Sequence, residues 1–169
     1  DVDAERITVT GSGMQALAIS IQMLIAPEDN MVFVTPVWPN IHGLVGIMGG
    51  ETRDVALDRN QGGFSLDLDR LFAACDDRTR AIFLNSPNNP TGWTMEADEQ
   101  RALLEFCRRR GIWIVADEVY ARLIYDRPHA PSFLEVADPD DRVLVVNSFS
   151  KPWAMTGWRL GWLTRPAHL

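Results

Sequence analysis

The sequence predicts an α/β protein in which helices cover both faces of a mostly parallel central sheet, a three-layer α/β/α arrangement. Short apolar runs that suit buried strands alternate along the chain with stretches whose apolar residues recur at helical spacing. The 169 residues, 46% of them hydrophobic, suffice for one such domain with a substantial core. Polar residues follow several of the apolar runs, and a parallel sheet would gather them at one edge.

The expected strands cover residues 7–10, 31–35, 52–57, 80–84, 112–116 and 142–146, with one more over 158–163. Helices are expected over residues 14–25, 41–48, 68–75 and 95–110, with a turn at 60–63. The first helix is apolar nearly all round, which predicts burial on most sides. Asp67 and Thr94 are the expected N-caps of the last two helices. The basic run Arg108–Arg110 suits the final helix's dipole better than a binding role, and Gly111 ends that helix.

The composition argues against several classes of partner. Acidic residues outnumber basic ones by 23 to 16, a net charge of −7, so a nucleic-acid partner is not expected. Cys75 and Cys107 lie in helical patterns without metal-ligand spacing, and are interpreted as reduced core thiols of a cytoplasmic protein. No apolar run is long enough to cross a bilayer, so no membrane partner is expected. Because the sequence starts at Asp1 and enters a strand almost at once, we expect a piece of a longer chain.

Lys151 is the only lysine in a sequence that has 15 arginines, which indicates a position that needs an amine. A guanidinium stays protonated, whereas a buried amine can lose its proton and attack a carbonyl group to form a Schiff base. Lys151 is therefore the candidate covalent anchor. Taken without its neighbours, such a residue is more often an ordinary surface lysine, so the motifs around it decide.

Two stretches near the N-terminus follow expected strands. The glycine-containing turn Gly11–Gly13 leads into a helix, which either presents free backbone N–H groups to a phosphate or simply makes a tight turn. Trp38 follows the second strand between Pro36 and Pro39, which stiffen the loop around a large flat ring. A ligand contact and core packing are both open for this side chain.

Two later strand ends carry side chains that suit a ligand. Asn88 and Asn89 lie between two prolines, so their amide groups are held in a firm loop. Asp117 follows an almost wholly apolar strand, where a carboxylate needs a cation or a protonated ligand as its partner. A ligand is the favoured interpretation for Asp117, with a helix N-cap as the competitor.

Four segments together resemble the successive signatures of the class I/II aminotransferases, which are pyridoxal 5′-phosphate (PLP) enzymes of the aspartate aminotransferase fold. In order, they are Ser12–Leu17, Asn88–Gly92, Asp117–Tyr120 and Asn147–Trp162. The resemblance runs through essentially the whole chain. It implies that residues 1–169 form the PLP-binding large domain of fold type I, with the family's N-terminal segment and small C-terminal domain outside them.

The resemblance also implies roles for individual residues. Lys151 would form the internal aldimine, a Schiff base with the PLP aldehyde, and then move the proton between substrate and cofactor, which needs a lowered pKa. Asp117 would pair with the pyridine nitrogen and make the ring an electron sink. Tyr120 and Asn89 would hydrogen-bond the phenolic oxygen, and Trp38 would stack on the ring. The phosphate would be held by the following set: Gly13, Met14, Gln15, Ser148 and Arg159.

The implied function is transfer of an amino group between an L-amino acid and a 2-oxo acid, by an enzyme that is a homodimer in this family. One alternative keeps the cofactor and changes the outcome to β-elimination by a C–S lyase. Another is a PLP-sensing domain of a transcription regulator. The substrate itself cannot be assigned, because Trp93, Trp113 and Trp153 are interpreted as core residues rather than as contacts for an aromatic substrate.

Overall fold

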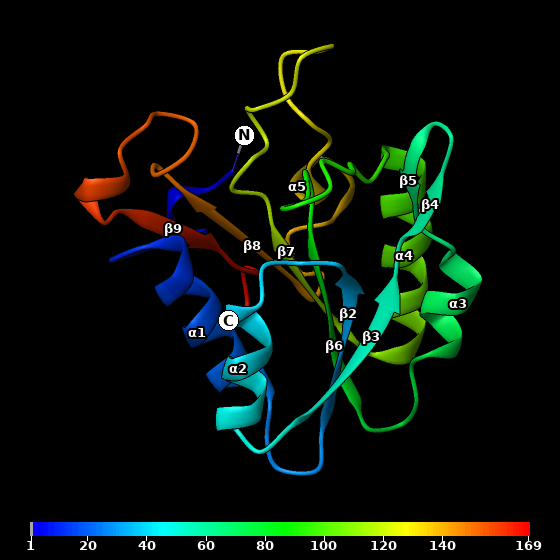
Figure 1. The fold of residues 1–169 in the computed structure, drawn as a ribbon. Helices are drawn as coiled ribbons and strands as arrows, with labels where there is room; N and C mark the ends of the chain where they lie inside the picture. Colours follow the sequence, from blue (N-terminus) through cyan, green and yellow to red (C-terminus); the bar gives the residue numbers. More distant parts are fainter. Residues whose placement is uncertain (1) are drawn as a thin grey trace.

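The computed structural model describes residues 2–169, and within them seven strands form one central sheet between two groups of helices (Figure 1). The strands of this sheet are β1 (Ile7–Thr10), β2 (Asn30–Thr35), β3 (Glu51–Ala56), β6 (Thr79–Asn85), β7 (Trp113–Asp117), β8 (Val143–Ser148) and β9 (Gly161–Thr164). Their spatial order is β1-β9-β8-β7-β6-β2-β3, and only β9 runs antiparallel to its neighbours. The predicted three-layer, mostly parallel fold is confirmed.

The helices lie on both faces of the sheet. The α-helices are α1 (Gly13–Leu24), α2 (Asn40–Ile47), α3 (Leu68–Ala73), α4 (Ala97–Arg110) and α5 (Phe133–Val136). Two short 3₁₀ helices, η1 (Ala4–Arg6) and η2 (Thr156–Trp158), and a two-stranded hairpin of β4 (Asp58–Asn60) and β5 (Gly63–Ser65) complete the described elements. The helices α1 and α2 cover one face, while α3, α4 and α5 cover the other (Figure 1).

Alternation along the strands explains the two layers. In β2, Val32 and Val34 pack with the α3 and α4 side, whereas Met31 and Phe33 pack with α1 and α2. All four side chains are fully buried, as expected for a central strand covered on both faces. The near-continuous apolar sequence of β2 and of β7 is thus a direct consequence of the two helix layers.

Most helix boundaries follow their capping residues. Asp67 caps α3 by accepting a hydrogen bond from the Arg70 N–H (3.0 Å), as predicted. The prediction of Thr94 as the cap of α4 is wrong, because Glu96 takes that place and forms a capping box with Glu99. At the other end of α4, Gly111 adopts a left-handed backbone conformation with φ +67°.

Other elements depart from the sequence-based expectations. The last strand begins at Gly161, and residue 158 lies in η2 instead. The helix α5 and the β4–β5 hairpin were not predicted, although the turn between the two hairpin strands was. The helix α1 is buried along one side only, with Gln22 and Met23 exposed. Among the tryptophans interpreted as core, Trp153 is exposed.

No helix within the described part of the chain is long and apolar enough to cross a lipid bilayer. Both cysteines are free thiols, Cys107 buried and Cys75 half-buried, and burial raises the pKa of Cys75 to about 11. The basic run at the end of α4 is engaged in ion pairs, since Arg108 contacts Asp141 (2.6 Å) and Asp138 (3.0 Å). These contacts support a structural rather than a binding role for the run.

Candidate active site

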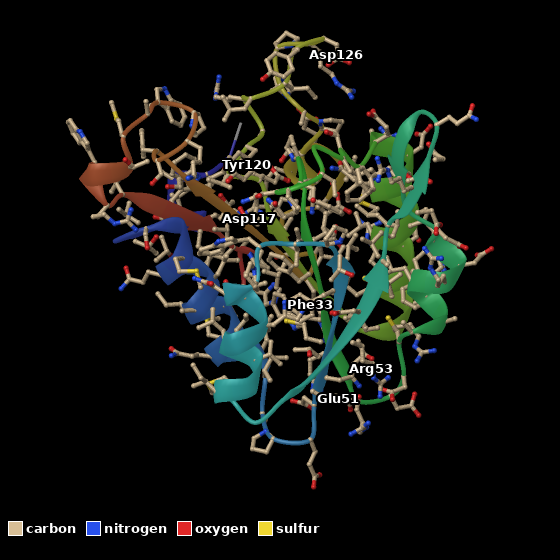
Figure 2. The ribbon with its side chains drawn as sticks, viewed as in Figure 1. Phe33, Glu51, Arg53, Asp117, Tyr120 and Asp126 are labelled. Carbon is tan, nitrogen blue, oxygen red and sulfur yellow. The ribbon has the colours of Figure 1, made fainter. Side chains whose placement is uncertain are left out.

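A pocket of about 270 Å³ lies at the carboxyl ends of the parallel strands, where the polar strand-end residues converge. Figure 2 shows two of them, Asp117 and Tyr120, near this end of the sheet. The lining residues come from α1, the β2–α2 loop, the loop after β6, the end of β7 and the β8–β9 loop. Segments far apart in the sequence thus meet here because six of the seven strands point the same way.

Asp117 is the carboxylate of the pocket. It lies at the last position of β7, half-buried, and its Oδ1 accepts a hydrogen bond from the Val119 N–H (3.2 Å). No ion pair to Asp117 is present among residues 2–169, and burial raises the pKa of its carboxyl group to about 6. Since no helix follows directly, Asp117 is not a helix N-cap. It is a poorly solvated carboxylate that a protonated ligand would match.

A chain of hydrogen bonds joins the backbone of Asp117 to the Asn89 side chain. Asn85, which is in register with Asp117 on the neighbouring strand, donates its Nδ2 to the Asp117 carbonyl (2.9 Å). Its Oδ1 accepts from the Asn89 N–H (2.7 Å), and Asn89 Nδ2 donates in turn to the Tyr120 hydroxyl (3.3 Å). Burial raises the pKa of Tyr120. The loop after β6 and the end of β7 are therefore held as one unit.

The loop that carries Asn89 is ordered by its neighbour Asn88. Asn88 Oδ1 accepts hydrogen bonds from the Thr91 N–H (3.1 Å) and the Thr91 hydroxyl (2.7 Å), while the Gly92 N–H donates to the Asn88 carbonyl (2.8 Å). The Asn88 side chain is buried and organises the loop from within. Of the two asparagines in this loop, only Asn89, the predicted site residue, lines the pocket at Asp117.

The N-terminus of α1 forms another wall. Ser12 caps this helix through a hydrogen bond from the Gln15 N–H to Ser12 Oγ (3.1 Å), which leaves the N–H groups of Gly13 and Met14 without acceptors in the described chain. The turn packs so closely on β9 that a Cβ on Gly161 would lie 2.5 Å from the Gly13 nitrogen. Glycine at position 161 is thus required for this approach.

The hydroxyls of Ser148 and Ser150 face the same wall. Ser148 Oγ donates to Ser150 Oγ (3.0 Å) and accepts from the Ser150 N–H (3.0 Å), so the two hydroxyls are held next to each other. Both residues line the pocket together with Ser12, Gly13 and Met14. Hydroxyls and free N–H groups around one helix N-terminus make a site suited to an anion.

Lys151 and Arg159 line the pocket from the β8–β9 loop, and both are exposed. Arg159 donates from Nη1 to the Thr156 carbonyl (2.9 Å), and its backbone adopts a left-handed conformation (φ +50°). The sequence argument expected a buried amine at position 151, whereas the structure places Lys151 at the surface of the pocket. Burial of this amine would need a group that covers or fills the pocket.

The remaining candidates divide between the pocket and its surroundings. Trp38 is 43% exposed and lines the pocket, which excludes core packing as its role. Gln15 is not a lining residue, since its side-chain Oε1 accepts from the Gly11 N–H and its own N–H goes to Ser12. Sequence reasoning missed Asn85 and Ser150. A signal existed for each: Asn85 ends a strand beside Asp117, and Ser150 lies two residues after Ser148.

The comparisons with known proteins agree with this geometry. The family described as aminotransferase class I and II matches residues 1–169. The arginine–pyruvate transaminase of Pseudomonas aeruginosa is 36% identical over 168 residues, which are 99% of this chain and 42% of that protein. A probable aspartate aminotransferase of Methanocaldococcus jannaschii is 35% identical over 96% of this chain and 42% of its own length. The chain therefore spans less than half the length of these curated relatives.

Solved structures show the same fold. The N-succinyldiaminopimelate aminotransferase from Mycobacterium tuberculosis superposes with a TM-score of 0.93 at 31% identity, over 99% of this chain and 44% of that one. The aspartate aminotransferase from Thermotoga maritima gives a TM-score of 0.91 at 32% identity, over 98% of this chain and 44% of that chain. With the family match over the full sequence, these likenesses show that the chain belongs to the class I and II aminotransferases.

Proposed function

We propose that the protein containing this chain is a PLP-dependent aminotransferase, and that residues 1–169 are its cofactor-binding large domain. It would move an amino group between an L-amino acid and a 2-oxo acid. The observation that carries the proposal is the meeting of Lys151, Asp117 and the α1 N-terminus in one pocket. The aminotransferase names of the relatives support it, whereas a C–S lyase or a regulator domain has no such support.

The residues present fit PLP, which has a basic ring nitrogen at one end and a phosphate at another. Asp117, a carboxylate that lines the pocket and has no ion-pair partner in the described chain, would hold a protonated ring nitrogen. The Asn89 and Tyr120 pair, already hydrogen-bonded to each other, would bind the phenolic oxygen. Trp38, exposed at the pocket wall, offers a flat face for the ring.

The anion-binding wall fits the phosphate. The free N–H groups of Gly13 and Met14, the Ser148 and Ser150 hydroxyls and the Arg159 guanidinium all line this part of the pocket. The N–H groups, the Ser150 hydroxyl and the guanidinium can donate hydrogen bonds, Ser148 holds Ser150 in place, and the helix dipole of α1 adds positive potential. Gln15 would support this wall indirectly, because its N–H donates to Ser12 and its side chain accepts from Gly11.

Lys151 would perform two tasks with one amine. Its primary amine can bind covalently to an aldehyde, and when released it can carry a proton to or from a carbon held above the pocket. PLP supplies an electron sink that stabilises negative charge on that carbon. A carboxylate at position 117 keeps the positive end of that sink in place, and the fixed Asn89 and Tyr120 groups orient the ring.

The proposal extends to the whole protein. Its amino-acid and 2-oxo-acid substrates would be selected by parts outside residues 1–169, and its functional unit would be a cytoplasmic homodimer. The relatives to which the chain is similar are more than twice its length, which supports a division between a cofactor-binding part and a substrate-selecting part.

The test uses the whole protein incubated with PLP, reduced with borohydride, and mapped by mass spectrometry. A single reduced adduct on Lys151 is expected. A separate, unreduced sample given both substrates should form equal amounts of new amino acid and new 2-oxo acid. Lys151→Ala is the matched control and should give no adduct. Pyruvate and ammonia formed without an amino acceptor would identify a lyase, and a folded protein without any adduct would end the PLP assignment.

A further inference from the structure

The β8–β9 loop, residues 149–160, carries Lys151 but has few polar contacts to fix its shape. Its backbone hydrogen bonds run from Phe149 N–H to the Leu160 carbonyl (3.1 Å) at its base, from Ala154 N–H to the Lys151 carbonyl (3.3 Å), and from Trp158 N–H to the Met155 carbonyl (3.2 Å). The Lys151 amine itself makes no hydrogen bond or ion pair to the described residues. Figure 1 shows this orange loop projecting beyond the end of the sheet. Ring contacts add to these hydrogen bonds around the lysine's turn.

Aromatic rings bracket Lys151 in the sequence and touch each other in space. The ring centroids of Phe149 and Trp153 are 4.9 Å apart, and those of Phe149 and Trp162 are 5.2 Å apart in an edge-to-face arrangement. Trp162 belongs to β9, where it is in register with Asn147 of β8. We call Phe149, Trp153 and Trp162 the aromatic clasp. It connects the lysine's turn to the sheet.

A cation lies over one ring of the clasp, that of Trp153. The guanidinium carbon of Arg122 lies 5.6 Å from the centroid of the Trp153 ring, and Arg122 makes no ion pair with the described residues. Arg122 follows Tyr120 in a turn that is fixed by hydrogen bonds from Ala121 N–H to the Glu118 carbonyl (2.9 Å) and from Leu123 N–H to the Tyr120 carbonyl (2.8 Å). The contact therefore links the Asp117–Tyr120 strand end to the lysine's loop.

We infer that Trp153 and Arg122 are positioning residues for Lys151, which set where its amine lies relative to Asp117. Phe149 and Trp153 lie two residues before and two residues after the lysine, so their contact closes the turn between them. Arg122 then fixes that turn against the element that carries Asp117 and Tyr120. The inference rests on the proposed function of Lys151 and adds two residues that do not line the pocket.

The first readout needs no cofactor. In the cofactor-free whole protein, the rate at which an amine-reactive nitrobenzenesulfonate labels Lys151 is followed by peptide mapping. Trp153→Ala should change this rate by about threefold to tenfold, the range expected for loss of one aromatic contact. Trp153→Phe, which keeps a ring, should restore it. Trp158→Ala is the matched control, because Trp158 lies on the same loop, is 71% exposed and belongs to no ring pair in the described chain.

Two substitutions test the contact between Arg122 and the Trp153 ring: one removes the charge, and the other keeps it on a differently shaped side chain. Arg122→Met keeps the apolar stem and loses the cation, and should shift the labelling rate in the same direction as Trp153→Ala but by about twofold to fivefold. Arg122→Lys keeps the cation and should lie near the wild-type rate. In the loaded enzyme, both Trp153→Ala and Arg122→Met should lower kcat while the KM for the amino acid stays within about twofold.

The outcomes are separable. Labelling rates of Trp153→Ala and Arg122→Met that equal the rate of Trp158→Ala would overturn the inference, even if Lys151 proves to carry PLP. If Trp153→Ala does not fold, the exposed Arg122→Met and Arg122→Lys pair decides instead. Failure of the wild-type protein to form a Lys151 adduct would defeat the proposed function but leave the labelling comparison readable.

Discussion

The two ends of the central sheet differ in whether their charged side chains form ion pairs. At the amino ends of the strands, charged side chains are paired: Arg53 with Asp76 (2.8 Å), Arg78 with Glu51 (3.1 Å) and Arg80 with Asp29 (2.9 Å). At the carboxyl ends, Asp117, Lys151 and Arg159 make no ion pair within residues 2–169. Figure 2 shows Glu51 and Arg53 at one end of the sheet and Asp117 and Tyr120 at the other.

The amino-end network is organised around Asp76. Its Oδ1 accepts from Asn30 Nδ2 (2.8 Å) and from the Arg78 N–H (2.9 Å), and Thr79 Oγ1 bridges to Asn30 Oδ1 (2.7 Å). The hydrogen bond from Asn30, together with the Arg53 guanidinium, holds the pKa of Asp76 well below its usual range. Asp117 is the reverse case, since burial without a cation raises its pKa to about 6.

The contrast teaches how to separate stabilising charges from functional ones in one domain. Charges whose hydrogen-bonding capacity is filled by neighbours stabilise the fold and are unavailable to a ligand. Charges left without a partner at a shared strand end cost stability and are available for binding and chemistry. Substitutions at the two ends should therefore affect different measurements.

The largest effect is expected from Lys151→Ala. Amino-group transfer by the whole protein should fall by several orders of magnitude, because Lys151 is the amine that lines the pocket together with Asp117. The urea midpoint should not change, since the side chain is exposed and forms no hydrogen bond within the described residues. Lys151→Arg is the control, which keeps the charge and should be equally inactive. Measurable transfer by either variant would contradict the assignment.

Asp117→Asn should separate activity from stability. Amino-group transfer should slow by orders of magnitude, because the ring nitrogen of the proposed PLP cofactor would lose its anionic partner. The raised pKa of about 6, against about 4 in an unfolded chain, means that the folded state binds the proton more tightly. Stability therefore falls as pH rises from about 4 to about 6 and stays lower above that range.

Asparagine at position 117 cannot ionise, so it removes this loss of stability at higher pH. The cofactor-free variant should be more stable than wild type at pH 7 by about 1–3 kcal/mol, and the difference should vanish near pH 4. Urea denaturation at pH 4, 5, 6 and 7 measures both. Equal stability at every pH would show that Asp117 is better solvated than its position indicates.

Asp76→Asn tests the opposite end of the sheet. The depressed pKa of Asp76 means that its carboxylate stabilises the fold above pH about 4 and that this contribution is lost as pH falls below that value. The variant should have a lower urea midpoint at pH 7 and a shallower loss of stability on acidification. Its kcat should stay within about twofold of wild type, which makes it the counterpart of Asp117→Asn. A large loss of kcat would break the division between the two ends.

The smallest effect tests a paired charge near the active-site end of the sheet. Glu96 caps α4 and forms an ion pair with Arg127 (2.5 Å), which lowers the pKa of its carboxyl group. Glu96→Ala should lower the free energy of unfolding by on the order of 1 kcal/mol and leave transfer unchanged. Thr94→Ala is the matched control and should have no measurable effect on stability. Equal losses in the two variants would restore Thr94 as a cap.

Much of the fold could be predicted because period and composition agree locally. The strands β2, β6, β7 and β8 are apolar runs with turn residues beyond them, Asp67 begins α3, and Gly111 ends α4 as expected. The departures arise where two local signals compete. Thr94 is a good capping residue, yet Glu96 has both Glu99 and Arg127 as partners, and these tertiary contacts decide the boundary.

The residues of the candidate site could be predicted from the sequence, but the hydrogen bonds and ring contacts between them could not. Lys151, Asp117 and Asn89 could be found because each differs from its neighbours in chemistry at a strand end. The bond from Asn85 to the Asp117 carbonyl depends on strand register, which the sequence does not display. The exposure of Lys151 likewise depends on the path of a loop, and the aromatic clasp joins two residues of this loop to one residue of β9.

The antiparallel strand β9 has a consequence for the order in which the chain is assembled. It lies between β1 and β8, and β1 pairs with no other strand in residues 2–169. Ile7 therefore cannot pair until Thr164 is in place. During synthesis, β1 and its glycine turn emerge long before β9 and remain without a sheet partner in the described chain until β9 follows. The wall at the N-terminus of α1 can therefore close only after the lysine's loop has been made, which couples completion of the pocket to the strand that follows this loop.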